Sequence, residues 1–233
     1  MFDLVMFDLD GTLVDTAPDI CGALNATLRE FGLPGVPESL VKHWIGQGTQ
    51  ALLERACARA TEASSGRVRS AKSIDGVLAA FERHYVEHCG RRSKPFPMVV
   101  SSLRGLRGFG VRTALLTNKE QRFAVEVLHA HRLRHYFDPI VAGDTLPEKK
   151  PSAVPVRYCL QRCGVRPERA LLVGDSSIDV ETARNAGVAV WAVPYGYNRG
   201  RPIAESKPDR VIPSLASVLE AVASKPRPER KLA

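Results

Sequence analysis

The sequence lacks an apolar stretch long enough to cross a membrane. No window of its 233 residues approaches the roughly 18 consecutive apolar residues of a membrane helix. The chain begins Met1-Phe2-Asp3, without the basic segment and apolar run of a secretion signal. These absences predict a cytoplasmic protein that has no membrane partner.

Cysteine is scarce, and its spacing excludes further classes. The five cysteines are odd in number and include no C-x-x-C pair. A disulfide framework or a cysteine-rich zinc site is therefore not indicated, and we expect reduced thiols.

Acidic residues are outnumbered, but the basic excess is not concentrated. Lysine and arginine total 33 against 25 aspartates and glutamates, a formal charge of +8. The basic residues are scattered and are not interleaved with aromatic residues, which make up only 6% of the chain. This pattern favours a solvated surface over a nucleic-acid interface, so a nucleic-acid binder is the weaker alternative.

From residue 112 onward, short apolar runs alternate with helical stretches. We expect strands over 112–117, 139–142, 170–174, 189–193 and 210–212, and helices over 120–131, 152–163, 178–186 and 215–223. Such alternation is typical of βαβ crossovers. It predicts an α/β fold with a Rossmann-like, mostly parallel sheet and helices on both faces.

The segment 16–95 has a different pattern. Its apolar residues recur at helical spacing, as in Ile20, Leu24 and Leu28, with glycine, proline and serine breaks between the periodic stretches. We therefore predict an all-helical cap domain over 16–95, inserted into a discontinuous core formed by 1–15 and 96–225. Residues 226–233 are expected to form a disordered tail.

Two carboxylates follow the first apolar run of the chain. Asp8 and Asp10 come directly after residues 4–7, and alternate residues of a strand point the same way. Two such charges about 4 Å apart repel by roughly 4 kcal/mol at an effective dielectric near 20. A cation, a shared proton or both must offset this repulsion, which points to metal-assisted chemistry.

Polar residues also follow the other predicted strands. In an open parallel sheet, ligands bind beyond the carboxyl ends of the strands. Those ends carry D-x-D-G-T-L at Asp8, L-L-T-N ending at Asn118, K-P at Lys150 and G-D-S-x-x-D from Gly174 to Asp179. In this order and spacing, the set resembles the haloacid dehalogenase superfamily, in its phosphatase branch.

The resemblance implies a covalent phosphatase mechanism. Asp8 is then the nucleophile that forms an aspartyl phosphate, and Asp10 is the general acid and base. Thr117 and the backbone amide of Asn118 would bind the phosphoryl oxygens, whereas the role of the Asn118 side chain stays open. Lys150 would neutralise both the phosphate and the nucleophile.

The resemblance also implies a Mg²⁺ site. Asp8, Asp175 and the main-chain carbonyl of Asp10 would hold the ion, with Asp179 as an additional ligand or a supporting carboxylate. A hard divalent cation would also supply the positive charge that the site needs, since Lys150 alone cannot balance these carboxylates and a phosphate. Its neighbour Lys149 is expected to be a bystander.

A helical cap favours a small phosphorylated metabolite as substrate. The segment from His43 to Gly48 resembles the specificity loop of phosphoglycolate phosphatases, with Gly46 and Gly48 as the substrate-binding positions. This implies hydrolysis of 2-phosphoglycolate. We expect a monomer or a homodimer, and the sequence does not decide between them. The alternatives are a phosphatase acting on pyrophosphate, a sugar phosphate or a nucleotide, a phosphoglucomutase, and a non-catalytic binding module.

Overall fold

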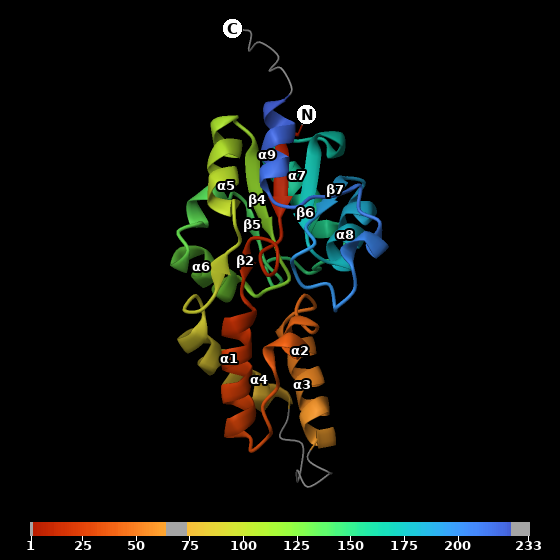
Figure 1. Ribbon diagram of the computed structural model, residues 1–233. Coiled ribbons are helices and arrows are strands. Elements are labelled where there is room, and N and C mark those ends of the chain that lie inside the picture. The colour runs from red at the N-terminus through yellow and green to blue at the C-terminus, as the bar shows by residue number, and fades with distance from the viewer. Residues whose placement is uncertain (1, 64–73, 225–233) are drawn as a thin grey trace.

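A six-stranded parallel sheet forms the centre of the computed structural model, which describes residues 2–63 and 74–224 (Figure 1). The strands lie in the order β5-β4-β1-β6-β7-β8. Their bounds are β1 Leu4–Phe7, β4 Arg112–Leu116, β5 Ile140–Val141, β6 Ala170–Gly174, β7 Ala189–Ala192 and β8 Arg210–Val211. Because the chain builds the sheet outward in both directions from β1, the order reverses there, and the crevice for a ligand is expected beyond the end of β1.

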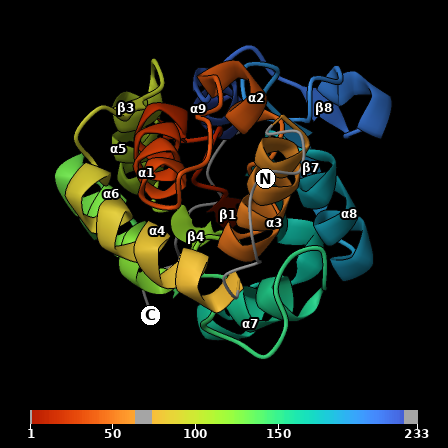
Figure 2. The same ribbon diagram turned by 90° about the horizontal axis from the view of Figure 1, so that it is seen from below.

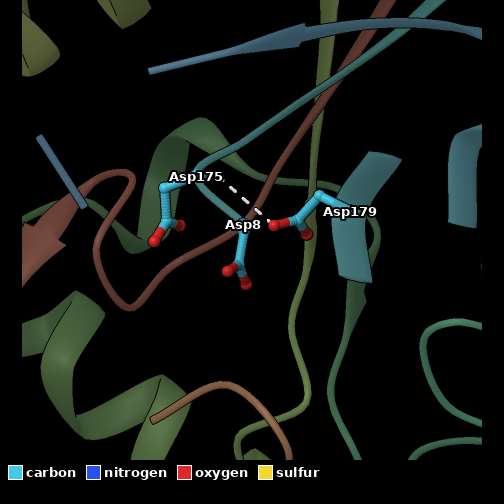
Figure 3. Close-up of side chains that lie close together, drawn as sticks. All are labelled: Asp8, Asp175 and Asp179. Carbon is cyan, nitrogen blue, oxygen red and sulfur yellow. Dashed lines mark hydrogen bonds between the residues drawn. The ribbon is translucent and has the colours of Figure 1, made fainter. Parts of the chain in front are cut away.

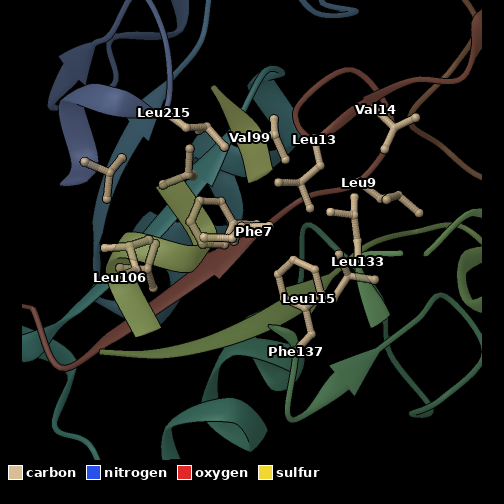
Figure 4. Close-up of a cluster of buried hydrophobic side chains, with 14 of the residues drawn as sticks. Phe7, Leu9, Leu13, Val14, Val99, Leu106, Leu115, Leu133, Phe137 and Leu215 are labelled. Atoms are coloured by element: carbon tan, nitrogen blue, oxygen red, sulfur yellow. The ribbon is translucent and has the colours of Figure 1, made fainter. Parts of the chain in front are cut away.

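Helices cover both faces of this sheet, which confirms the predicted fold class. One face carries α5 (Val99–Gly108), α6 (Gln121–Ala130) and α9 (Ala216–Ala223), and the other carries α7 (Val154–Cys163) and α8 (Ser177–Ala186). Side chains of β1 alternate between the two layers. Phe7 packs in the first layer (Figure 4), whereas Met6 packs in the second.

Four further helices lie beyond the carboxyl edge of the sheet (Figure 1). They are α1 (Ala17–Glu30), α2 (Glu38–Lys42), α3 (Thr49–Ala63) and α4 (Ile74–His88). The view from below shows α1, α3 and α4 arranged around the end of β1 (Figure 2). They share an apolar cluster of their own that includes Leu24, Leu53 and Phe81. This separate cluster agrees with a cap, although the boundaries 1–15, 16–95 and 96–225 stay predictions.

The chain passes between the sheet and these helices through a short antiparallel pair. This pair joins β2 (Val14–Asp15) to β3 (Lys94–Pro95), with Val14 opposite Pro95. Strands of two residues leave no periodic signal, so the sequence did not reveal them. The pair fixes both crossing points next to the end of β1.

The elements predicted after residue 112 are confirmed to within two residues at each end. Helix α7 starts at Val154 rather than 152, because Pro155 lacks an amide donor and is tolerated only in the first helical turn. Helix α5 was not predicted. Among the described residues, short 3₁₀ helices also connect the elements: η1 Arg134–Tyr136, η2 Pro167–Arg169 and η3 Ile203–Ser206.

Two other expectations can be placed against the structure. The predicted tail at 226–233 lies outside the described residues. Within 2–63 and 74–224, no helix combines the length and apolar character that a membrane crossing requires.

Candidate active site at the carboxyl edge of the sheet

Asp8 and Lys150 form a buried ion pair at the end of β1. The Lys150 Nζ lies 2.8 Å from Asp8 Oδ1 and 2.7 Å from Asp179 Oδ1, and the lysine is only 4% exposed. Burial by itself would lower the pKa of Lys150, but the charges of Asp179 and Asp8 outweigh that effect and raise it. Lys150 is therefore a permanent cation beside the predicted nucleophile.

The carboxyl group of Asp8 has an unusual affinity for protons. Burial raises its pKa from 3.8 to about 6, the charge of Lys150 opposes this shift, and the charge of Asp179 adds to it. A group that is desolvated in this way binds either a proton or a cation. Asp8 is thus well suited to a cation-dependent reaction near neutral pH.

Three buried carboxylates gather around this point. Asp8, Asp175 and Asp179 each place an oxygen within 4.8 Å of the other two (Figure 3). Burial, followed by the charges of Asp8 and Asp179, raises the pKa of Asp175. In the described part of the chain, Lys150 is the cation paired with this cluster. An excess of hard oxygen donors over cations fits a divalent metal ion.

Asp175 is held from two sides. The Thr12 hydroxyl donates to its Oδ1 at 2.6 Å, and the backbone amide of Tyr197 donates to its Oδ2 at 2.5 Å. Gly11, at φ +88°, allows the loop after β1 to come this close, because a Cβ there would lie 2.4 Å from the Asp175 Oδ2. The site therefore depends on a glycine that sequence reasoning treated only as part of a motif.

Asp179 sits in the first turn of α8. Its Oδ2 accepts hydrogen bonds from the backbone amide and the hydroxyl of Ser176, at 3.1 and 2.6 Å, and from the amide of Asp175 at 3.3 Å. With the hydroxyl of Ser176, this forms a capping box. One carboxylate thus orders the helix start and pairs with Lys150.

Asp10 lies outside the acidic cluster and has different partners. The Thr16 hydroxyl donates to its Oδ1 at 2.7 Å, and the Lys119 Nζ lies 3.3 and 3.2 Å from its two oxygens. The two carboxylates of the first motif are therefore separated electrostatically. Asp8 is paired with Lys150, and Asp10 is paired with Lys119.

Asn118 connects the cap loop to the lysine segment. Its amide nitrogen donates to the carbonyl of Gly46 at 3.1 Å and to the carbonyl of Lys150 at 3.0 Å. This geometry answers the question that the sequence left open about its side chain. Gly46 and Gly48 both have positive φ, at +114° and +96°, which is the region that glycine tolerates best.

All seven residues predicted as catalytic or substrate-binding line one cavity between the sheet and the helices. They are Asp8, Asp10, Gly46, Gly48, Thr117, Asn118 and Lys150. The cavity also has apolar lining residues, namely Leu52 of α3, Phe81 of α4 and Ile45 of the segment between α2 and α3. The space open to the centre of a water molecule is about 40 Å³. The metal candidates Asp175 and Asp179 lie beside Asp8.

Sequence reasoning missed three residues of this site. Lys119 lines the cavity and pairs with Asp10, and Thr12 and Tyr197 hold Asp175. Thr12 is the threonine of the D-x-D-G-T-L motif, and Lys119 directly follows the motif residue Asn118. These positions are a signal that could have identified both residues. The side chain of Tyr197 packs with the cap helices. Its contact with Asp175 uses the backbone, so no side-chain pattern could have predicted it.

Comparisons with known proteins agree with this geometry. The family model of haloacid dehalogenase-like hydrolases matches residues 5–193. A phosphoglycolate phosphatase of Thiobacillus denitrificans is 40% identical over 212 residues, which covers 91% of this chain and 92% of that protein. Phosphoglycolate phosphatase 1 of Pseudomonas aeruginosa is 42% identical over 216 residues, with coverages of 93% and 78%.

A solved structure is also similar throughout its length. The crystal structure of a predicted phosphoglycolate phosphatase from Haemophilus somnus superposes with a TM-score of 0.90 at 35% identity, covering 94% of this chain and 97% of that one. The similarity therefore extends over the sheet and the helices beyond its carboxyl edge.

Proposed function

This chain belongs to the haloacid dehalogenase-like hydrolase family, and we propose that it hydrolyses 2-phosphoglycolate to glycolate and phosphate. The observation that carries the proposal is the buried Asp8–Lys150 pair on the floor of a small cavity, with Asp10 held separately beside it. Relatives named phosphoglycolate phosphatase support the choice of substrate.

The proposed reaction has two steps. A carboxylate oxygen of Asp8 attacks phosphorus, the bond to the ester oxygen breaks, and Asp10 gives its proton to the departing alkoxide. Asp10 then takes a proton from water as the water oxygen attacks the aspartyl phosphate, which releases phosphate and restores Asp8. In both steps, Lys150 lies close enough to Asp8 to offset the charge of the phosphoryl oxygens.

We also propose that the required metal is Mg²⁺. The carboxylates of Asp8 and Asp175 and the main-chain carbonyl of Asp10 would hold it, with Asp179 as an additional ligand or a supporting carboxylate. When bound, a divalent ion stabilises negative charge on the phosphoryl group. The protein's own part is to keep the carboxylates desolvated and Lys150 in contact with Asp8.

The cavity favours a small substrate. Its water-accessible space is about 40 Å³, and apolar side chains from the cap helices close one side of it. Exclusion of bulk water strengthens the electrostatic contacts inside. Thr117 and Asn118 would bind the phosphoryl oxygens, while Gly46 and Gly48 would face the rest of the molecule.

A panel of phosphate monoesters, assayed for phosphate release with Mg²⁺ and with a chelator, tests the proposal. We expect 2-phosphoglycolate to have the highest kcat/KM and the chelator to abolish turnover. A preference of more than tenfold for pyrophosphate, a sugar phosphate or a nucleotide would contradict the assignment. Conversion of a sugar phosphate without phosphate release would indicate a mutase, and no turnover of any substrate would indicate a binding module.

A further inference from the structure

Lys119 occupies an unusual position for a lysine. It follows Thr117 and Asn118 at the end of β4, and only 5% of its side chain is exposed. Its Nζ lies 3.2 Å from Asp10 Oδ2 and 4.7 Å from the centre of the Tyr85 ring, which belongs to α4. The ammonium group is therefore placed between the sheet and the cap helices, where a desolvated charge is retained only with suitable partners.

The charges that line the cavity indicate a task for this lysine. Four charged side chains line it, namely Asp8, Asp10, Lys119 and Lys150. Lys150 is already in contact with Asp8 and Asp179, at the place assigned to the phosphoryl group. A second anionic group on the substrate would find one remaining cation among the described residues that line this cavity, and that cation is Lys119.

The contact with Asp10 places Lys119 near the leaving-group end of the substrate. In the proposed reaction, Asp10 delivers its proton to the ester oxygen. In 2-phosphoglycolate, a single methylene carbon separates this oxygen from the carboxylate. A cation that touches Asp10 is consequently within reach of the carboxylate, whereas Ile45, Leu52 and Phe81, which also line the cavity, offer only apolar side chains.

We propose that Lys119 is the specificity-determining residue that binds the carboxylate of the substrate. This inference rests on the proposed function and adds the group that recognises the non-reacting end of the molecule. The Tyr85 ring holds the ammonium from the cap side, so the recognising charge is in place when the cap helices lie over the cavity.

Lys119→Met separates recognition of the carboxylate from other roles when two substrates are compared. Ethyl phosphate has the two-carbon leaving group of 2-phosphoglycolate without the carboxylate. We expect the variant to lose about 10- to 100-fold more kcat/KM on 2-phosphoglycolate than on ethyl phosphate, since a charge-assisted contact is removed from one substrate only. Most of this difference should be in KM, and Lys119→Arg should restore part of it.

A binding readout accompanies the kinetics. Glycolate should inhibit the wild-type enzyme competitively and inhibit Lys119→Met at least about tenfold more weakly. Lys42→Met is the matched control, because Lys42 lies on α2 and pairs with Glu38 rather than lining the cavity. Lys42→Met should leave kcat/KM on both substrates and the inhibition by glycolate unchanged. Melting curves establish folding, and Lys119→Gln repeats the comparison if the methionine variant does not fold.

Two results would overturn the inference, and they are distinguishable. Equal losses on both substrates would mean that Lys119 only positions Asp10, while the wild-type preference for 2-phosphoglycolate and the proposed function would stand. A wild-type enzyme that does not favour 2-phosphoglycolate over ethyl phosphate would refute the proposed function itself and leave Lys119 no carboxylate to recognise.

Discussion

Lys150 and Asp179 form an ion pair of 2.7 Å that holds the lysine against Asp8. The Asp179 carboxylate is shielded from solvent, because it is only 1% exposed. Its other oxygen accepts three hydrogen bonds at the start of α8. Its remaining capacity to bind a metal ion is therefore smaller than that of Asp175, whose oxygens each accept one hydrogen bond from the described residues.

This difference predicts unequal effects of two otherwise similar substitutions. Asp175→Asn should raise the Mg²⁺ concentration required for half-maximal activity by about 10- to 100-fold. Asp179→Asn should lower kcat by a comparable factor, since Lys150 loses its anchor, but should shift the Mg²⁺ requirement less. Metal titrations of activity and isothermal calorimetry of Mg²⁺ binding measure the two effects. Equal shifts in metal affinity would show that Asp179 is a full ligand.

Asp8→Asn should abolish turnover while preserving the fold. An amide cannot form the aspartyl phosphate, so kcat should fall by roughly 1,000-fold or more. Asp3→Asn is the matched control, because Asp3 precedes β1 at the opposite end and pairs with Arg169 on the surface. Its activity should be that of the wild type. Retained activity in Asp8→Asn, checked by phosphate release, would refute covalent catalysis.

Lys150→Gln should damage both activity and stability. Removal of the cation leaves the charges of Asp8 and Asp179 buried without an opposite charge beside them, which costs about 3 kcal/mol in the free energy of unfolding. Loss of its charge beside the phosphoryl group should lower kcat roughly 100- to 1,000-fold. Denaturant unfolding and steady-state kinetics measure the two effects.

The neighbouring lysine provides the comparison for this variant. Lys149 is exposed and donates to the carbonyl of Gln47 at 3.3 Å. Lys149→Gln should change stability by less than about 1 kcal/mol and kcat by less than about threefold. Similar effects of the two substitutions would contradict the assignment of Lys150 as the lysine of the site.

Gly11→Ala should disturb the metal site through Asp175. The new Cβ would lie 2.4 Å from the Asp175 Oδ2, at a backbone φ of +88° that costs an alanine about 1 kcal/mol or more. We expect weaker Mg²⁺ binding, measured by calorimetry, and a lower melting temperature. Gly76→Ala in α4 is the control, since no described atom beyond the chain neighbours of Gly76 and the adjacent helix backbone lies within 4 Å of the added Cβ. It should stabilise the protein by about 0.5 kcal/mol and leave Mg²⁺ binding unchanged.

The raised pKa of Asp8 predicts opposite pH trends for stability and for metal binding. In the folded protein the pKa of Asp8 is raised to about 6, whereas the ordinary pKa of an aspartate is 3.8. Without metal, the folded state holds this proton more tightly than the unfolded chain does. The contribution of Asp8 to stability is therefore greatest below about pH 4 and decreases as the pH rises through 6.

Melting curves in the absence of metal check this trend. The melting temperature of Asp8→Asn relative to the wild type should increase between pH 4 and pH 7, because only the wild type loses a proton from position 8. Mg²⁺ binding, in contrast, should weaken as the pH falls below 6, since the proton competes with the cation for Asp8. A pH-independent difference between the two proteins would contradict the shifted pKa.

The sequence by itself determined the parallel sheet, because buried strands and amphipathic helices leave apolar periods that can be counted. It also identified most of the polar residues of the site from their positions after strands, and the structure brings Asp8, Asp10, Thr117, Asn118 and Lys150 to one cavity. Motif spacing is local information, and strand ends in such a sheet necessarily meet at one edge.

Only the tertiary structure decided how these charges are paired. The sequence does not reveal the distance in space between Lys119 and Asp10, or between Tyr197 and Asp175, because each contact joins segments that are distant in the chain. It likewise left the Asn118 side chain without an assignment. Hydrogen bonds and ion pairs form only when the distance between two atoms is right to within a few tenths of an ångström. The joint packing of the cap helices, the loop after β1 and the sheet sets these distances.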